Sequence, residues 1–247
     1  MVSESNYLLA LDAGNTRIKW GIALEHGWIA RDALPTARAA DLAEALEAAP
    51  RARHAIASNV AGPALQAELE LACQAIGVSL RVIRSEAEQL GVTNGYREPT
   101  QLGSDRWAAL IAAHRAHGGH KLVVNAGTAL TVDALTADGR FVGGIIVPGP
   151  GLMRTSLNRG TAGLRLTEGA FHFLPLTTPD AITSGAIQAA VGAVARMHDA
   201  MAGAGATPPL VVLSGGAAAE IAPHLPLEVV IHENLVLDGL VLIGRQA

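Results

Sequence analysis

The sequence contains the same short pattern twice, about half a chain apart. In residues 8–21 (LLALDAGNTRIKWG) and in residues 122–133 (LVVNAGTALTVD), an apolar run is followed by a polar residue, Ala and Gly. The residues after each Gly alternate between polar and apolar, which is the period of a half-buried strand. Each segment is therefore predicted to form two strands joined by a tight turn. The equivalent residues Asp12 and Asn125 are 113 positions apart, which predicts two similar halves.

Helical and strand patterns alternate along the rest of the chain, which predicts an α/β fold. The Ala- and Leu-rich helical patterns cover residues 36–47, 63–76, 105–117 and 178–201, the last with a break near Gly185. Short strands are predicted at residues 55–58, 80–83, 143–147, 210–213 and 229–231. The His-Gly-Gly-His sequence at 117–120 is the predicted boundary, which divides the chain into domains at 1–118 and 119–247.

Composition excludes several classes of protein. Half of the 247 residues are hydrophobic, too many for a disordered chain. A formal charge of −4, with no run of Lys and Arg, argues against nucleic-acid binding. No apolar stretch approaches the ~18 residues of a membrane-spanning helix, and the first residues lack the basic stretch of a signal peptide. Cys73 is the only cysteine, which fits a reducing compartment. From these features together we expect a cytoplasmic protein that binds neither nucleic acid nor membranes.

The two repeated turns are suited to binding phosphate. Gly14 allows the backbone to approach a ligand closely, and neighbouring N–H groups can then hold phosphate oxygens. Asp12 would hold Mg²⁺ through water, since Mg²⁺ retains much of its hydration. Taken alone, residues 12–16 are equally compatible with an ordinary hairpin turn. The second copy at 125–129 and a third Gly-rich turn at 214–217 favour a nucleotide site.

A charged tetrapeptide, Gly103-Ser-Asp-Arg106, begins one of the predicted helices. Asp105 could serve there as a base, with the Arg106 guanidinium available to a carboxylate or phosphate. The tetrapeptide alone favours a simpler interpretation, a helix cap with a surface ion pair. His114, His117 and His120 have partly helical spacing, but no carboxylate or Cys completes a metal site, which favours a solvated face.

Taken together, these motifs resemble the type III pantothenate kinases, which belong to the sugar kinase and actin-like ATPase superfamily. The resemblance extends over nearly the whole chain and depends on the order and spacing of the motifs. The matching segments are Asp12–Thr16, Tyr96 with Gly103–Arg106, Gly127–Ala129 with Asp133, Gly143–Gly149, Thr178–Ile182 with Gly185, Ser214–Gly216 and Leu235–Leu240.

The resemblance implies two ribonuclease-H-like halves that face each other across a nucleotide cleft, and a homodimer. It also implies ATP-dependent phosphorylation of pantothenate, with Asp105 as proton acceptor and Mg²⁺ as cofactor. The ATP-binding residues would be Asp12, Ala13, Gly14, Asn15, Thr16, Arg17, Ile18, Lys19 and Thr128. The pantothenate-binding residues would be Tyr96, Gly103, Ser104, Asp105, Arg106 and Thr178, where Thr183 is close enough to be confused with Thr178.

One residue departs from the family pattern. At the position of Asn125 the family usually has Asp, which helps bind an activating monovalent cation, K⁺ or NH₄⁺. Asn retains a carbonyl ligand but lacks the charge, so we expect a weakened cation site. Two alternatives remain: a regulatory protein that binds nucleotide without catalysis, favoured by Asn125, and a related kinase for another hydroxylated acid. Asp12, Asp105 and Arg106 favour an active enzyme.

Overall fold

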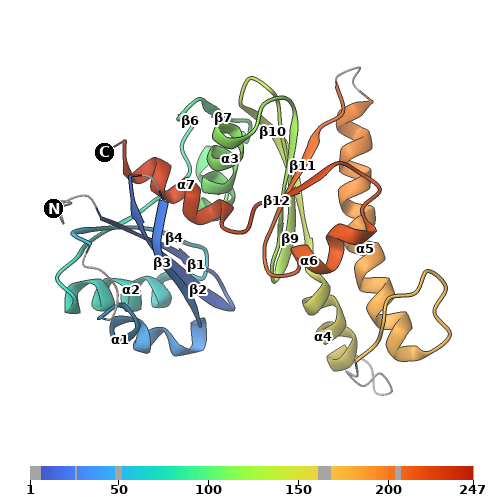
Figure 1. Ribbon diagram of the computed structural model, residues 1–247, viewed down its shortest axis with the longest axis horizontal. Coiled ribbons are helices and arrows are strands. Elements are labelled where there is room, and N and C mark those ends of the chain that lie inside the picture. The colour runs from blue at the N-terminus through green and yellow to red at the C-terminus, as the bar shows by residue number, and fades with distance from the viewer. Residues whose placement is uncertain (1–6, 26, 48–51, 161–167, 204–206, 247) are drawn as a thin grey trace. The chain divides into compact units, whose positions relative to one another are not determined.

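The computed structural model describes residues 7–25, 27–47, 52–160, 168–203 and 207–246. Contacts between Cα atoms divide the chain into two compact units. The first unit comprises residues 1–115 and 235–247, and the second comprises residues 116–234. Each unit contains β-strands of its own with helices packed against them (Figure 1).

The main sheet of the first unit has the strand order β3-β2-β1-β4-β5. The first three strands pair antiparallel, whereas β4 is parallel to β1 and β5 is parallel to β4. Its strands are β1 (Leu8–Ala13), β2 (Arg17–Leu24), β3 (Gly27–Pro35), β4 (His54–Asn59) and β5 (Ser79–Val82). The helices η2 (Thr36–Asp41), α1 (Leu42–Glu47) and α2 (Pro63–Ala75) follow β3 and β4.

Alternation along β1 separates the two faces of this sheet. Leu9, Leu11 and Ala13 belong to a buried cluster shared with side chains of α1 and α2. Because successive side chains of a strand point to opposite faces, Asp12 lies on the other face. Helix α7 (Leu235–Gly244) contacts β1, β2 and β4. The sequence pattern therefore places one carboxylate on the face opposite to the apolar cluster.

The remaining elements of the first unit follow β5. They are β6 (Glu88–Gln89), β7 (Val92–Asn94), η3 (Pro99–Gln101) and α3 (Ser104–Ala116). Helix α3 is almost completely buried from Arg106 to Ala113. It lies so close to α7 that a Cβ atom at Gly239 would be 1.9 Å from the carbonyl oxygen of Ala108. Glycine at 239 is therefore required by the packing of these two helices.

The second unit repeats the topology of the first. Its strands have the order β12-β11-β8-β9-β10, in which β8 and β9 form the hairpin equivalent to β1 and β2. The strands are β8 (Lys121–Ala126), β9 (Ala129–Leu135), β10 (Arg140–Pro148), β11 (Leu210–Ser214) and β12 (Val229–Ile231). The helices are α4 (Pro150–Gly160), α5 (Thr178–Ala202), α6 (Ala218–Ile221) and η4 (Ala222–His224). The predicted α/β class with two ribonuclease-H-like halves is confirmed.

Some elements differ from the sequence prediction. Strand β3 was not predicted, because it lies at the edge of its sheet and most of its residues are exposed, which hides the alternation. Helix α4 was missed because Pro150 is its only buried residue. Helix α5 continues through Gly185 without the predicted break. A Cβ atom at Gly185 would meet no other atom, so this glycine marks no kink or close packing.

The bounds of the two compact units also differ from the predicted division at residue 118. The chain enters the second unit at Ala116 and returns to the first at Leu235. Helix α7 therefore belongs to the first unit although it closes the chain, because it packs on β1, β2 and β4. None of the described helices combines the length and apolarity needed to cross a membrane.

Candidate active site

The side chain of Asp12 lies among polar groups of three neighbouring strands. In the sheet register, Asp12 on β1 pairs with Lys19 on β2 and with Ser58 on β4. Side chains that are directly opposite in register share one face of the sheet. Asp12 is half-buried and Ser58 is fully buried. The end of β1 therefore carries a carboxylate with a cationic side chain on one side and a hydroxyl on the other.

The turn after Asp12 is held by backbone and hydroxyl bonds. The N–H of Gly14 donates to the carbonyl oxygen of Arg17 at 3.1 Å, and the Thr36 hydroxyl donates to the carbonyl oxygen of Gly14 at 2.7 Å. Residues 15–17 at the tip are exposed. The side chains of Ala13 and Ile18, which were among the predicted ATP-binding residues, are fully buried in the core. Only their backbone atoms remain for a ligand.

Asp105 lies in the first turn of α3, directly after the short connection at Gly103. Its Oδ1 accepts a hydrogen bond of 2.8 Å from the backbone N–H of Arg106. A Cβ atom on Gly103 would be 2.6 Å from the same oxygen, so a larger residue there would displace the carboxylate. Burial raises the pKa of Asp105, and the N–H and charge of Arg106 oppose that rise. A raised pKa makes this carboxylate a better proton acceptor near neutral pH.

The two carboxylates, Asp12 and Asp105, lie close enough to influence each other. Burial, followed by the negative charge of Asp105, raises the pKa of Asp12 from 3.8 to about 7, whereas Lys19 lowers it. Two neighbouring acids that are both shifted upward are typical of a functional site. The predicted surface ion pair at Asp105 is therefore wrong, because both Asp105 and Arg106 are withdrawn from solvent.

Arg106 and Tyr96 form a second polar group beside Asp105. Arg106 is only 5% exposed, and its Nη1 donates a hydrogen bond of 3.1 Å to the Tyr96 hydroxyl. Asn94 holds this loop: its Nδ2 donates to the carbonyl oxygens of Glu86 and Pro99, and its Oδ1 accepts from the N–H of Tyr96. Residues 94–106 thus form a cross-linked loop that presents a cation and a phenol.

Ser104, another residue of the predicted substrate motif, also contacts the sheet. It begins α3 and is buried, and its Oγ lies 2.8 Å from Oγ of Ser58 on β4. Its hydroxyl therefore joins the helix to the sheet.

In the second unit, Asn125 lies at the end of β8, equivalent to Asp12 in the first. In register it pairs with Thr131 on β9 and Ser214 on β11, both of which carry neutral hydroxyls. The turn beyond it is packed against other backbone segments. A Cβ atom on Gly149 would lie 2.0 Å from the carbonyl oxygen of Gly127. A Cβ atom on Gly215 would lie 2.5 Å from the carbonyl oxygen of Ala126. The Gly-rich turns thus surround the Asn125 strand end closely.

Two further predicted residues lie in exposed turns. Thr128 is exposed, and its carbonyl oxygen accepts from the N–H of Gly149 at 2.8 Å. Thr178 is exposed at the first position of α5, whereas Thr183 is buried. The preceding Thr177 caps the helix by accepting from the N–H of Asp180. Of the two threonines that the sequence pattern could confuse, Thr178 is the accessible one.

The His residues near the predicted boundary differ from the expected solvated face. His114, His117 and His120 are only partly exposed, and each has a buried ring nitrogen. Burial, followed by the charges of His232 and Lys121, lowers the pKa of His117. The spacing of these histidines along the chain gives no indication of their burial, nor of the complete burial of Lys121.

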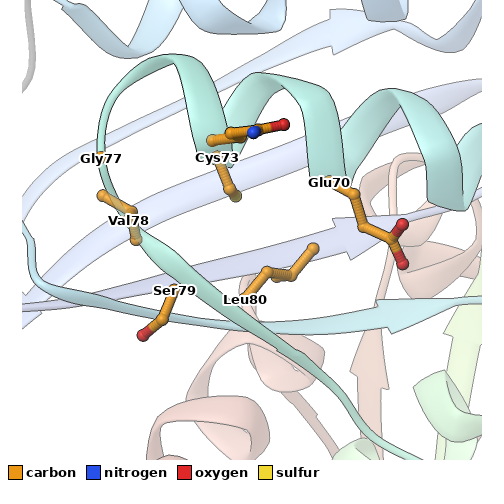
Figure 2. A pocket seen from close by; sticks show the side chains of 7 residues that line it. Glu70, Cys73, Gly77, Val78, Ser79 and Leu80 are labelled. Carbon is orange, nitrogen blue, oxygen red and sulfur yellow. The ribbon is translucent and has the colours of Figure 1, made fainter.

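A pocket of about 500 Å³ lies elsewhere in the first unit, between α2 and β5 (Figure 2). It is lined by Glu70, Cys73, Gln74 and residues 77–80. Figure 2 shows Cys73 and Leu80 between the helix and the strand. Burial raises the pKa of the Cys73 thiol to about 11, which leaves it protonated and unreactive. This pocket contains none of the predicted site residues.

Sequence reasoning missed Ser58 and Asn94. Ser58 follows the apolar residues 55–57 at a strand end, as Asp12 follows residues 8–11, so the same pattern could have identified it. Asn94 gave no comparable signal, because its role depends on contacts with Glu86 and Pro99.

Solved structures with a similar fold have low sequence identity. A protein described as a Baf family transcriptional activator from Campylobacter jejuni matches with a TM-score of 0.60 at 19% identity, over 96% of this chain and 98% of its own. MreB5 of Spiroplasma citri matches with a TM-score of 0.54 at 9% identity, over 98% and 97% of the two chains. These similarities show an actin-like fold.

Sequence comparisons identify the family. The model of the type III pantothenate kinase family matches residues 8–200. A type III pantothenate kinase from Aromatoleum aromaticum is 44% identical over 97% of this chain and 98% of its own length. Another from an Azoarcus species is 46% identical over 96% of this chain and 90% of its own. The chain, with its paired carboxylates at Asp12 and Asp105, therefore belongs to the type III pantothenate kinase family.

Proposed function

We propose that this protein transfers the γ-phosphoryl group of ATP to the primary hydroxyl of pantothenate, with Asp105 as proton acceptor. The product is 4′-phosphopantothenate, and the reaction is the first step of coenzyme A biosynthesis. The observation that carries the assignment of Asp105 is its position in the first turn of α3, beside the buried Arg106 and close enough to Asp12 for the two carboxylates to interact. Family membership supplies the substrates.

Each group at the site has a separate role in this proposal. Arg106, held by its bond to Tyr96, pairs with the carboxylate of pantothenate. Asp105 accepts the proton of the attacking hydroxyl and orients it. Phosphoryl transfer depends mainly on alignment and charge neutralisation, because its transition state is loose. The turn at residues 14–17 would bind phosphate oxygens, with Lys19 adding positive charge. Thr128, which is exposed, stays a predicted ATP-binding residue.

Mg²⁺ fits the residues at the end of β1. Hard oxygen ligands suit this ion, which is bound in kinases through one or two carboxylates together with waters and phosphates. In the described part of the chain, no three His, Cys, Asp or Glu side chains gather into a metal site, so a cage made only of protein ligands is not expected there. Asp12 would hold the ion through water. When bound, Mg²⁺ neutralises charge on the phosphates of ATP.

The raised pKa of Asp12 predicts a pH-dependent stability in the absence of Mg²⁺. Because the folded pKa is about 7 against 3.8 unfolded, the folded state binds the extra proton between these values. The stabilisation is present at low pH and is lost as the pH rises through about 7. We expect this group to change the free energy of unfolding by roughly 2–4 kcal/mol, after allowance for partial exposure.

Chemical unfolding of Mg²⁺-free protein at pH 5 and pH 8 measures this effect. Asp12→Asn is the control, because it removes the titrating group and should flatten the difference. Added Mg²⁺ should restore stability of the original protein at pH 8 and have little effect at pH 5. Equal pH dependence in the two proteins would contradict the shifted pKa.

Asn125 predicts weak dependence on monovalent cations. Its amide is neutral, and its register neighbours Thr131 and Ser214 add no negative charge. Turnover in sodium buffer is therefore expected to match turnover in potassium or ammonium buffer. Asn125→Asp should introduce activation by potassium, because it restores a charged ligand. Strong potassium activation of the original protein would refute this proposal.

A homodimer is also part of the proposed function. The segment before α5 exposes Phe173, Leu174 and Leu176 to 80, 86 and 96%. Large apolar side chains gathered in one exposed segment are typical of an interaction surface. The segment is held to α5, since the N–H of His172 donates to the buried Ser184 hydroxyl at 2.9 Å. Sedimentation equilibrium is expected to give twice the chain mass, and Leu176→Lys should shift it toward the monomer.

The test of the catalytic proposal is pantothenate-dependent release of ADP by the purified protein with Mg-ATP. Release that requires pantothenate supports the kinase. Binding of nucleotide without any release would instead favour the regulatory protein considered from the sequence. The presence of Asp12, Asp105 and Arg106 in one unit argues against that alternative, which only the neutral Asn125 favours. The single cysteine and the substrates are compatible with the cytoplasm.

A further inference from the structure

A buried pair of hydroxyls connects the strand beside Asp12 to the helix that carries Asp105. Oγ of Ser58 and Oγ of Ser104 are 2.8 Å apart, within hydrogen-bond distance. Ser58 is 0% exposed and Ser104 is 8% exposed. At this depth neither hydroxyl can easily exchange its partner for water, so the bond is a fixed feature of the fold.

The position of each serine relates it to one carboxylate. Ser58 on β4 is the direct register partner of Asp12 on β1, and neighbouring strands are held about 4.8 Å apart by their ladder. Ser104 immediately precedes Asp105 at the start of α3. The hydroxyl bond therefore forms a short chain of contacts from the strand of Asp12, through Ser58 and Ser104, to Asp105.

Connectivity along the chain does not supply this constraint. Between Ser58 and Ser104 the chain passes through α2, β5 and the loop held by Asn94. Ser85 anchors the same region by donating to the carbonyl oxygen of Leu102 at 2.6 Å, but it does not connect to the strand of Asp12. Of these two buried serine contacts, the one between Ser58 and Ser104 links strand β4, which pairs with the strand of Asp12, to the first turn of α3.

We propose that Ser58 is a positioning residue that acts through Ser104 to fix the Asp105 carboxylate relative to Asp12. The proposal rests on the proposed function, in which Asp105 takes the proton of the attacking hydroxyl. Alignment is the main contribution that an enzyme makes to phosphoryl transfer, and misplacement by about 1 Å can reduce turnover by about 100-fold.

Removing either hydroxyl has the same predicted consequence. Ser58→Ala and Ser104→Ala each break the bond and leave the other hydroxyl buried without its partner. Each variant is expected to lower kcat by about 10- to 100-fold. The double variant should be no slower than the slower single variant, because both substitutions remove the same contact. Ser104→Thr, which retains a hydroxyl, should recover most of the lost turnover.

Pantothenate affinity separates positioning from general damage. Arg106 and Tyr96 keep their own bond in Ser58→Ala, and Ser58 is not among the predicted substrate-binding residues, so calorimetric affinity of this variant for pantothenate without nucleotide should stay within about threefold of the original. Ala72→Gly in α2 is the stability control, because it should cost about 1 kcal/mol of helix stability at a buried position in the apolar cluster, on the face of the sheet opposite to Asp12. It should leave kcat unchanged.

Three outcomes would overturn the proposal. They are unchanged kcat in the serine variants, multiplied losses in the double variant, and losses in Ala72→Gly equal to those in Ser58→Ala. Failure of the proposed function gives a different result, since the original protein itself would then release no ADP in response to pantothenate. The two failures are thus distinguished by the original protein alone.

Discussion

Replacement of Asp105 by asparagine is expected to lower kcat for ADP release by about 10²- to 10⁴-fold, the range that general base catalysis contributes. Asparagine has nearly the same shape and can still accept a bond from the N–H of Arg106, so the helix start should be retained. It cannot accept the proton of the attacking hydroxyl. The affinity for ATP should change little, because Asp105 is assigned to the acceptor side of the reaction.

Asp32→Asn provides a matched control for this variant. Asp32 lies in the same unit, on β3, and its Oδ1 accepts a bond of 2.7 Å from the N–H of the next residue, Ala33. Asp32 thus makes the same type of hydrogen bond as Asp105, but it lies in a strand and is exposed. Steady-state kinetics of both variants should show a loss confined to Asp105→Asn. Near-normal turnover in that variant would refute the role of Asp105.

The strand ends were predictable from the sequence because they combine two strong local signals. An alternating apolar run specifies a strand, and a polar-Ala-Gly turn specifies where it ends. These signals predicted the hairpins at Asp12 and Asn125 and, from their spacing, two similar halves of the chain. A turn signal also predicted that helix α3 begins near Asp105. The α/β class with two similar halves followed from the same patterns, whereas the ribonuclease-H-like fold was implied by the family resemblance, and both are confirmed.

The contacts that adjust the site could not be predicted in this way. The bond between Ser58 and Ser104 joins residues 46 positions apart, and the bond between Arg106 and Tyr96 depends on the loop held by Asn94. A local pattern does not show burial either, so the pair at Asp105 was expected on the surface. Its raised pKa comes from tertiary burial.

The packing of the last helix, where the chain returns to the first unit, is another contact that could not be predicted from the sequence. The sequence shows that residues 235–244 are apolar but does not show what they pack against. The partner is decided by Gly239, which allows α7 to approach the backbone of α3 at Ala108. Ala108 is one turn beyond Asp105, so this contact supports the helix that carries the proposed base.

Gly239→Ala is therefore expected to have the largest effect on stability. The new Cβ atom would lie 1.9 Å from the carbonyl oxygen and 2.4 Å from the carbonyl carbon of Ala108. Backbone atoms cannot rotate away, so α7 and α3 must separate. The cost should reach at least the upper end of the ~1–3 kcal/mol typical of overpacking. Chemical unfolding measures it, and kcat should also fall because α3 carries Asp105.

Gly192→Ala tests whether the loss comes from the contact or from substitution of a helical glycine as such. Gly192 lies within α5, and a Cβ atom there would meet no other atom within 4 Å. Alanine at this position should stabilise the protein by about 0.5–1 kcal/mol, because it favours the helix and removes freedom from the unfolded chain. Opposite signs for the two variants are expected. If Gly239→Ala were also neutral or stabilising, α7 would not pack on α3 as described, and Asp105 would lose the support assigned to it.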